Sequence, residues 1–209
     1  MNQVLTPKRL NFYGLNVPIL FFFLLSSCAS VSYQHIYERS KGLDFKQGTW
    51  LVNTIESDIH GKSRIVLTNI LLQELKKLGD DSVHYIEDVS IDYLVPDNIQ
   101  FDLSSEAANI LHKTSGYDFL INLKTQKIRN DLHDINFPPP EDFSKSESEV
   151  TLVVYDIHTG QKIYSQRIIA SVSLDEEDED IKFAKSANSL VFKALKKGLK
   201  DLEKYSTSK

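Results

Sequence analysis

The sequence predicts an α+β fold in which helices pack on a mostly antiparallel sheet. Two stretches in the first half carry apolar residues at helical spacing, two long alternating stretches flank one short turn, and the C-terminal stretch is amphipathic. The expected order of elements is β-α-β-α-β-β-β-α, without an internal repeat. We therefore expect a single domain over residues 48–205, followed by a tail at 206–209.

The first half predicts a strand, a helix and a second strand. Residues 50–55 form a short, mostly apolar stretch, the first strand candidate. Apolar residues then recur at helical spacing at Leu67, Ile70, Leu71, Leu75 and Leu78. Gly79 is the expected C-cap of this helix, and residues 83–89 are the next strand candidate.

A second helix is predicted between Ser104 as its N-cap and Gly116 as its terminator. Its expected inward-facing residues are Ala107, Ile110 and Leu111. Residues 119–128 then alternate between apolar and polar side chains, which is typical of a half-buried strand.

The second half predicts a hairpin and a closing helix. Residues 149–157 and 162–174 alternate, and the turn at 158–161 joins them. The final helix is expected to bury one apolar stripe. Its members are Phe183, Ala187, Leu190, Val191, Ala194, Leu195 and Leu202.

Composition excludes some classes of function. The 209 residues carry a net charge of −5 and a single cysteine. An acidic chain is a poor nucleic-acid binder, because that binding depends on neutralising phosphates, so we expect no nucleic-acid partner. One cysteine cannot form an internal disulfide, so the stability of the fold must come from its core.

The N-terminal segment has the features of an export signal. Lys8 and Arg9 precede an almost wholly apolar run at residues 17–25, which is too short to span a bilayer as a helix. The run ends in the residues Leu25, Ser26, Ser27 and Cys28. This ending resembles the lipobox of bacterial lipoproteins. The resemblance implies recognition of Leu25, Ser26 and Ser27 by the signal peptidase, cleavage before Cys28, a diacylglyceryl group on the Cys28 sulfur and an acylated amine.

This interpretation divides the chain and predicts its location. Residues 1–27 would be the cleaved signal peptide, and residues 28–47 a lipidated N-terminus and short tether. Several acyl chains on Cys28 would hold the domain to the membrane durably. Ala29 follows the cysteine where an Asp often retains lipoproteins at the inner membrane. We therefore expect the periplasmic face of the outer membrane, or the cell membrane if the source has only one.

Three segments of the domain have a familiar combination of turns. They are residues 48–79, residues 115–121 and residues 153–161, the last containing Asp156, Thr159 and Gly160 in a strand–turn–strand pattern. Together they resemble the superfamily of penicillin-binding-protein activator lipoproteins and the curli-secretion lipoprotein. The resemblance spans residues 48–205 and implies a domain that binds envelope proteins. The chain has no room for the barrel strands of the curli-secretion protein, so no pore is expected.

Sequence motifs for chemistry are not found. The six histidines do not fall in a metal-ligand spacing, and no nucleophile elbow, phosphate loop or dinucleotide fingerprint occurs. Glycine is sparse, at 8 residues. We therefore expect no catalytic residue, no metal, no cofactor and no enzymatic activity.

One candidate partner-binding segment is Phe137, Pro138, Pro139 and Pro140. An exposed aromatic ring beside a stiff polyproline stretch can dock to a partner protein. The same composition also suits a plain rigid connector, so both interpretations stay open.

The other candidate is the acidic run that begins Asp175, Glu176, Glu177 and Asp178 and continues to Asp180. It could dock a basic partner or bind calcium, but it lacks the ligand spacing and glycine of a calcium loop. The simpler interpretation is a solvated turn whose acids favour the N-terminus of the helix that follows.

These observations lead to one functional hypothesis and one alternative. The first is a non-catalytic, membrane-anchored interaction module of the cell envelope that regulates wall synthesis through an unidentified protein partner. The alternative is a subunit of an envelope secretion or transport assembly, with homo-oligomers as one possibility.

Overall fold

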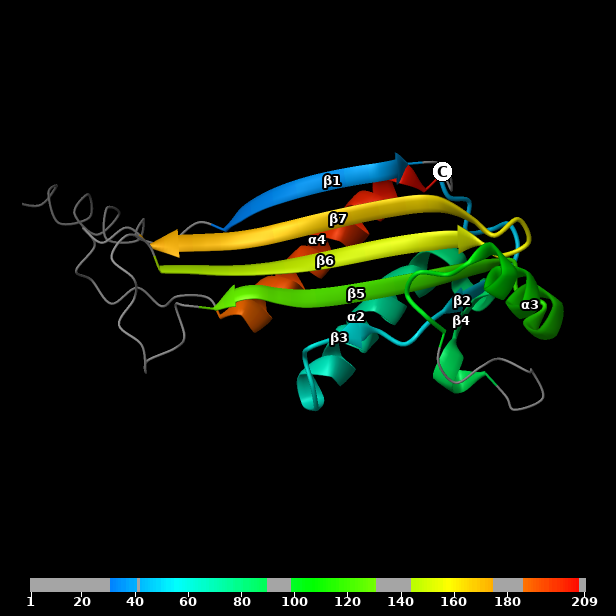
Figure 1. The fold of residues 1–209 in the computed structure, drawn as a ribbon, viewed down its shortest axis with the longest axis horizontal. Helices are drawn as coiled ribbons and strands as arrows, with labels where there is room; N and C mark the ends of the chain where they lie inside the picture. The colour runs from blue at the N-terminus through cyan, green and yellow to red at the C-terminus, as the bar shows by residue number, and fades with distance from the viewer. Residues whose placement is uncertain (1–30, 41, 90–98, 131–143, 175–185, 207–209) are drawn as a thin grey trace, which may run out of the picture.

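Four long strands dominate the sheet, and two helices cross one of its faces (Figure 1). The computed structural model describes residues 31–40, 42–89, 99–130, 144–174 and 186–206. The strands are β1 (Ser32–Ser40), β2 (Trp50–Val52), β3 (Glu56–Ser57), β4 (Val83–Tyr85), β5 (Phe119–Asn130), β6 (Ser144–Asp156) and β7 (Gln161–Leu174). The helices are α2 (Lys62–Gly79), α3 (Ser105–Ser115) and α4 (Ala187–Tyr205), with the 3₁₀ turns η2 (Asp80–Ser82) and η3 (Ile86–Asp88).

The α+β class is confirmed, but the sheet is mixed rather than mostly antiparallel. Its strand order is β1-β7-β6-β5-β2-β4, and β3 pairs with β5. The pairs β1–β7, β7–β6 and β6–β5 are antiparallel, whereas β2 is parallel to both β4 and β5. A helix connects β2 to β4 and another lies between β4 and β5, and such crossovers return the chain in the same direction. The helices between these early strands bring the strands together in parallel. The predicted antiparallel pairing is therefore wrong for this part of the sheet.

The first strand lies inside the range 28–47 that the sequence predicted as an N-terminus and tether. In β1, Tyr33 pairs with Ala170 and Tyr37 with Gln166 of β7, so this segment is the edge of the sheet. Leu43 and Phe45 are also buried, and the Phe45 ring stacks on Trp50 at 4.3 Å between centroids. Residues 31–40 and 42–47 of the expected tether are therefore part of the folded domain. An edge strand with one solvent-facing side is polar enough to resemble a linker in the sequence.

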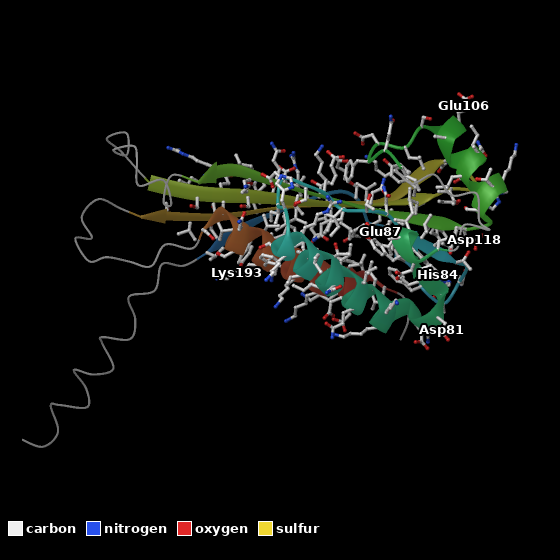
Figure 2. All side chains as sticks on the ribbon, turned by 90° about the horizontal axis from the view of Figure 1, so that it is seen from below. Asp81, His84, Glu87, Glu106, Asp118 and Lys193 are labelled. Atoms are coloured by element: carbon white, nitrogen blue, oxygen red, sulfur yellow. The ribbon has the colours of Figure 1, made fainter. Side chains whose placement is uncertain are left out.

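Helices α2 and α4 lie on one side of the sheet, and α3, marked by Glu106, lies on the other (Figure 2). The stripe predicted for the last helix is confirmed from Ala187 to Leu202, while Phe183 lies outside the described residues. In α2, Leu67, Leu71 and Leu75 are buried as predicted. The helix includes Gly79, and its C-cap is the following residue, Asp80. Among the described residues, none of the helices combines the length and apolar character needed to cross a bilayer.

Helix α3 begins and ends where the sequence predicted. The Ser104 side chain accepts a hydrogen bond from the Ala107 backbone N–H, and Gly116 caps the C-terminus with a φ of 72°. Its buried residues are Ala108, Leu111 and Ser115. The inward position predicted for Ile110 is wrong, because its side chain is 55% exposed. The helix turns Ala108, not Ile110, toward the core.

Candidate functional site

A groove of about 660 Å³ lies beyond the carboxyl end of β2. In sheets with parallel strands and covering helices, ligands commonly bind at this end of the strands. The groove is lined by Asn53, Thr54, Ile55, Glu56, Ser57, Arg64, Ile99, Gln100, Phe101 and Asn122. Its walls thus come from the segment after β2, the first turn of α2, the segment before α3, and β5.

A buried asparagine holds one wall of the groove. Asn53 directly follows β2 and is only 3% exposed. Its side-chain amide donates to the Ile99 carbonyl at 2.7 Å, and its side-chain oxygen accepts from the Thr54 N–H at 2.8 Å. Its backbone N–H donates to the Ile121 carbonyl of β5 at 3.0 Å. One residue therefore ties the segment before α3 to two strands.

A second buried asparagine, Asn122 of β5, holds the same segment from the sheet side. Its amide nitrogen donates to the carbonyls of Phe101 at 2.7 Å and Gln100 at 3.2 Å. Asn122 is 1% exposed, and among the described residues its side-chain oxygen has no hydrogen-bond donor. A polar side chain buried at this depth stays stable only because it satisfies backbone groups. The two asparagines therefore shape the groove.

Charged residues surround the groove on its open side. Arg64 of α2 lines it, and Lys124 of β5 forms a salt bridge with Glu56. The hydrogen bond from Lys124 to Glu56 raises the pKa of the lysine. The Lys124 ammonium also lies 5.7 Å from the centroid of the Phe101 ring, which is within the range of a cation–π contact. The groove thus offers both signs of charge beside an aromatic surface.

Two smaller hollows share residues with the groove. The first, of about 310 Å³, shares Arg64 and includes Tyr85. Burial and the Glu87 carboxylate raise the pKa of Tyr85 to about 12. The second, of about 210 Å³, shares Ile99 and Gln100 and is mainly apolar, with Leu103, Ala107, Ile110 and Leu111 in its wall. The three hollows thus adjoin one another through these shared residues.

One hydroxyl group of the groove is held by its neighbours. Ser57 shares a hydrogen bond of 2.7 Å with Thr125 and accepts one of 2.9 Å from the Ile59 N–H. Among the residues that the structure describes, no group of three or more His, Cys, Asp or Glu side chains is placed to hold a metal ion.

The site residues predicted from the sequence lie elsewhere in the chain. Leu25, Ser26, Ser27 and Cys28, the segment Phe137 to Pro140, and the acidic residues Asp175 to Asp178 all lie outside the described residues. The groove was not predicted from the sequence. The feature of the sequence that indicates it is an asparagine beside apolar residues, which occurs twice. Asn53 follows Trp50-Leu51-Val52, and Asn122 lies within Leu120-Ile121-Asn122-Leu123.

The aspartates of the familiar turns have structural roles. Asp118, directly before β5, accepts hydrogen bonds from the Thr49 N–H at 2.8 Å and the Thr49 hydroxyl at 3.1 Å. Asp156 accepts from the backbone N–H groups of His158 and Thr159, which closes the turn between β6 and β7. As expected, these segments form turns and strand starts.

No protein-family model matches this chain, and none of the curated protein sequences is significantly similar to it. Solved structures with a related arrangement exist at low sequence identity. The PelC dodecamer from Paraburkholderia phytofirmans is 11% identical, with a TM-score of 0.45, and the match covers 83% of this chain and 97% of that one.

Two further structures are similar at the same level. The hypothetical protein CT253 from Chlamydia trachomatis is 13% identical, with a TM-score of 0.40 and coverage of 77% of this chain and 99% of that one. The lipoprotein GNA1162 from Neisseria meningitidis is 11% identical, with a TM-score of 0.36 and coverage of 75% and 98%. At these values the likeness carries no conclusion about function.

Proposed function

We propose that this protein is a lipid-anchored, non-catalytic interaction module of the bacterial cell envelope. The observation that carries the proposal is the lipobox-like run Leu25-Ser26-Ser27-Cys28, placed after a basic and then an apolar segment. It implies export, lipidation of Cys28 and retention at a membrane. Ala29 at the next position favours the outer membrane, on its periplasmic face.

The position of β1 supports close placement of the domain against that membrane. Ser32, the first residue of β1, is four positions after Cys28. An extended chain of this length reaches about 14 Å. The pairing of Ser32 with Ser171 places the start of β1 beside the end of β7 (Figure 1). This end of the sheet would therefore lie at the membrane surface.

The groove would then lie within reach of membrane-bound partners. Asn122 is eight residues before Asn130, where β5 ends at the membrane-proximal end of the sheet. At about 3.4 Å per residue, the groove is about 27 Å from that end. We propose that the groove binds a protein partner at this height, and that the process served is the regulation of wall synthesis.

The anchoring is tested by replacing Cys28. The change Cys28→Ser should abolish incorporation of labelled palmitate and release the protein from the membrane fraction into the soluble one. Inhibition of the lipoprotein signal peptidase should leave a larger precursor of the wild-type chain. Normal maturation under that inhibition would contradict the proposal.

The interaction role is tested by crosslinking in living cells, followed by mass spectrometry of the proteins that copurify. The variant Arg64→Ala removes the groove cation, and Lys196→Ala, an exposed change on α4, serves as its control. We expect recovery of a peptidoglycan synthase that Arg64→Ala reduces and Lys196→Ala does not. Equal recovery with both variants would exclude the groove as the binding surface.

A second candidate function, a subunit of a secretion or transport assembly, is favoured by the edge of the sheet. Within the described residues β1 pairs only with β7, so its other edge is open to a strand from a second copy. Light scattering of the purified lipoprotein distinguishes the two functions. A ring-sized particle that copurifies with transport components supports the assembly, and a monomer supports the interaction module.

A further inference from the structure

Two histidines that are remote in sequence meet at one end of the molecule. His112 lies near the C-terminal end of α3, and His158 lies in the turn between β6 and β7. Nε2 of His112 and Nδ1 of His158 are 3.3 Å apart, and the two rings are 5.0 Å apart at an angle of 73°. His158 is exposed and His112 is partly buried, so solvent and small ions reach the pair.

The hydrogen bond at the far side of His112 determines which of its nitrogens is free. Nδ1 of His112 lies 2.8 Å from the Tyr117 carbonyl oxygen. A carbonyl can only accept, so Nδ1 carries the proton and the lone pair of the neutral ring is on Nε2. Metal-binding histidines have this arrangement, in which one nitrogen donates to a backbone carbonyl and the other binds the metal.

The turn that carries His158 is fixed against α3. Asp156 accepts hydrogen bonds from the backbone N–H groups of His158 at 3.0 Å and of Thr159 at 3.1 Å. Gly160 has a φ of 68°, and a β-carbon at this position would come within 2.8 Å of the Ser105 α-carbon. The turn therefore packs on Ser105, the first residue of α3, and leaves no room for a side chain at position 160. The hydrogen bond to Tyr117 positions the His112 ring, and these contacts fix the backbone that carries His158.

We propose that Nε2 of His112 and Nδ1 of His158 form a two-histidine site for a divalent transition metal ion. In a tetrahedral site, two metal–nitrogen bonds of about 2.0–2.1 Å place the nitrogens about 3.3–3.4 Å apart. The observed 3.3 Å matches that separation. The same distance also allows a hydrogen bond between the two rings, which a bound metal ion would replace.

The ligand set determines the kind of metal and the strength of binding. Imidazole nitrogens prefer Zn²⁺, Ni²⁺ and Cu²⁺ over Mg²⁺ and Ca²⁺, and the Irving–Williams order makes Cu²⁺ the tightest of these. Within the described chain no third His, Cys, Asp or Glu completes the set, so water fills the remaining positions. The ring of His84, labelled in Figure 2, packs on the Tyr117 ring with 5.6 Å between centroids and is not part of the two-histidine site. The site is therefore an exchangeable one.

Metal binding at this place would add a bond between two elements that already pack on each other. Helix α3 follows the segment that forms one wall of the groove, and the β6–β7 turn closes the longest hairpin of the sheet. A ligand that binds only the folded state stabilises it by mass action. The site does not depend on the proposed function, because it uses neither the anchor nor the groove.

The test uses the full mature lipoprotein in detergent, without a histidine tag. ZnCl₂ and CuCl₂ are titrated by calorimetry into the wild type and the variants His112→Gln, His158→Gln and His60→Gln. His60 is exposed and precedes α2, so it is the matched control. We expect one ion per chain, a loss of affinity of at least about tenfold in each of the first two variants, and no change in His60→Gln.

A spectroscopic measurement separates metal binding from a structural role of the histidines. The electron paramagnetic resonance spectrum of the Cu²⁺ complex should show hyperfine splitting from two nitrogens, reduced to one in His158→Gln. His158 is an exposed turn residue, so that variant should fold even if His112→Gln weakens the hydrogen bond to Tyr117. Unchanged affinity in His158→Gln, or equal losses in all three variants, would overturn the proposal.

Discussion

The Tyr37 hydroxyl of β1 donates a hydrogen bond of 3.1 Å to the Asp201 carboxylate of α4, which joins the first strand to the last helix. Asp201 is only 7% exposed and also accepts from the Gln166 amide at 3.4 Å. His35 Nδ1 lies 3.0 Å from the same carboxylate, although it is not aligned for a hydrogen bond. The Lys204 ammonium lies 3.6 Å from the other carboxylate oxygen, so the largely buried charge of Asp201 is held by this cation and by its hydrogen-bond donors together.

This network predicts a loss of stability at alkaline pH. Burial and the Asp201 carboxylate raise the pKa of Tyr37 to about 12, while an unfolded tyrosine ionises near pH 10. The unfolded chain therefore loses this proton first, so the contribution is complete below about pH 10 and is lost as the pH rises to about 12. Urea denaturation at a series of pH values should show the midpoint falling across this range.

The variant Tyr37→Phe isolates the contribution of this side chain. It removes a hydrogen bond to a charged group and should lower the free energy of unfolding at pH 7 by about 1–2 kcal/mol. It should also reduce the alkaline slope. Tyr205→Phe, which alters a more exposed ring in contact with Tyr37, is the control. An identical alkaline slope in wild type and Tyr37→Phe would show that Tyr37 does not couple to folding.

A second prediction concerns the aromatic stack around Trp50, the first residue of β2. The rings of Phe45 and Phe119 lie 4.3 Å and 4.2 Å from the ring of Trp50, between centroids. Phe45→Ala should lower the free energy of unfolding by about 3–5 kcal/mol, as expected for a large core truncation. The fluorescence of Trp50, the single tryptophan, reports the unfolding directly.

The neighbouring change Lys46→Ala is the matched control, because Lys46 is exposed. It should change stability by no more than about 0.5 kcal/mol. Equal, small effects of both changes would mean that residues 42–47 behave as the tether first expected.

A third prediction uses two glycines at positive φ. Gly116, with a φ of 72°, has open space where a β-carbon would lie, whereas Gly160, with a φ of 68°, faces the Ser105 backbone. Gly116→Ala should cost about 1 kcal/mol from backbone strain alone. Gly160→Ala should cost about 1–3 kcal/mol more, because the turn must move off α3.

Thermal denaturation of the two variants measures that difference. Because His158 belongs to the same turn, Gly160→Ala should also weaken Zn²⁺ binding. Equal losses of stability in the two variants would indicate that the turn is not seated on the helix.

A fourth prediction concerns the wall of the groove. Asn122→Ala removes both side-chain donors to the Gln100 and Phe101 carbonyls and should lower the free energy of unfolding by about 1–3 kcal/mol. Hydrogen exchange should become faster in residues 99–104. Gln126→Ala, an exposed change on the same strand, should leave both measurements unchanged. Unaltered exchange in Asn122→Ala would mean that other contacts hold this wall.

Local features of the sequence determined much of the fold. Ser104 and Gly116 bound α3 as predicted, and the alternating stretches around Gly160 form the β6–β7 hairpin. Caps, turns and periodicity depend on residues a few positions apart, so they can be identified without knowledge of the rest of the molecule. The run that ends in Cys28 is also local, and the anchoring it predicts is open to the tests above.

Contacts between remote segments decided the rest. Parallel pairing of β2 with β5, and the place of β1 at the sheet edge, depend on which strands meet. The groove depends on Asn53 and Asn122 reaching carbonyls of the segment before α3. His112 and His158, 46 residues apart, form a pair only because the hairpin turn packs on α3. Such contacts depend on how the whole core packs. A single sequence gives the side chains but not which of them are in contact.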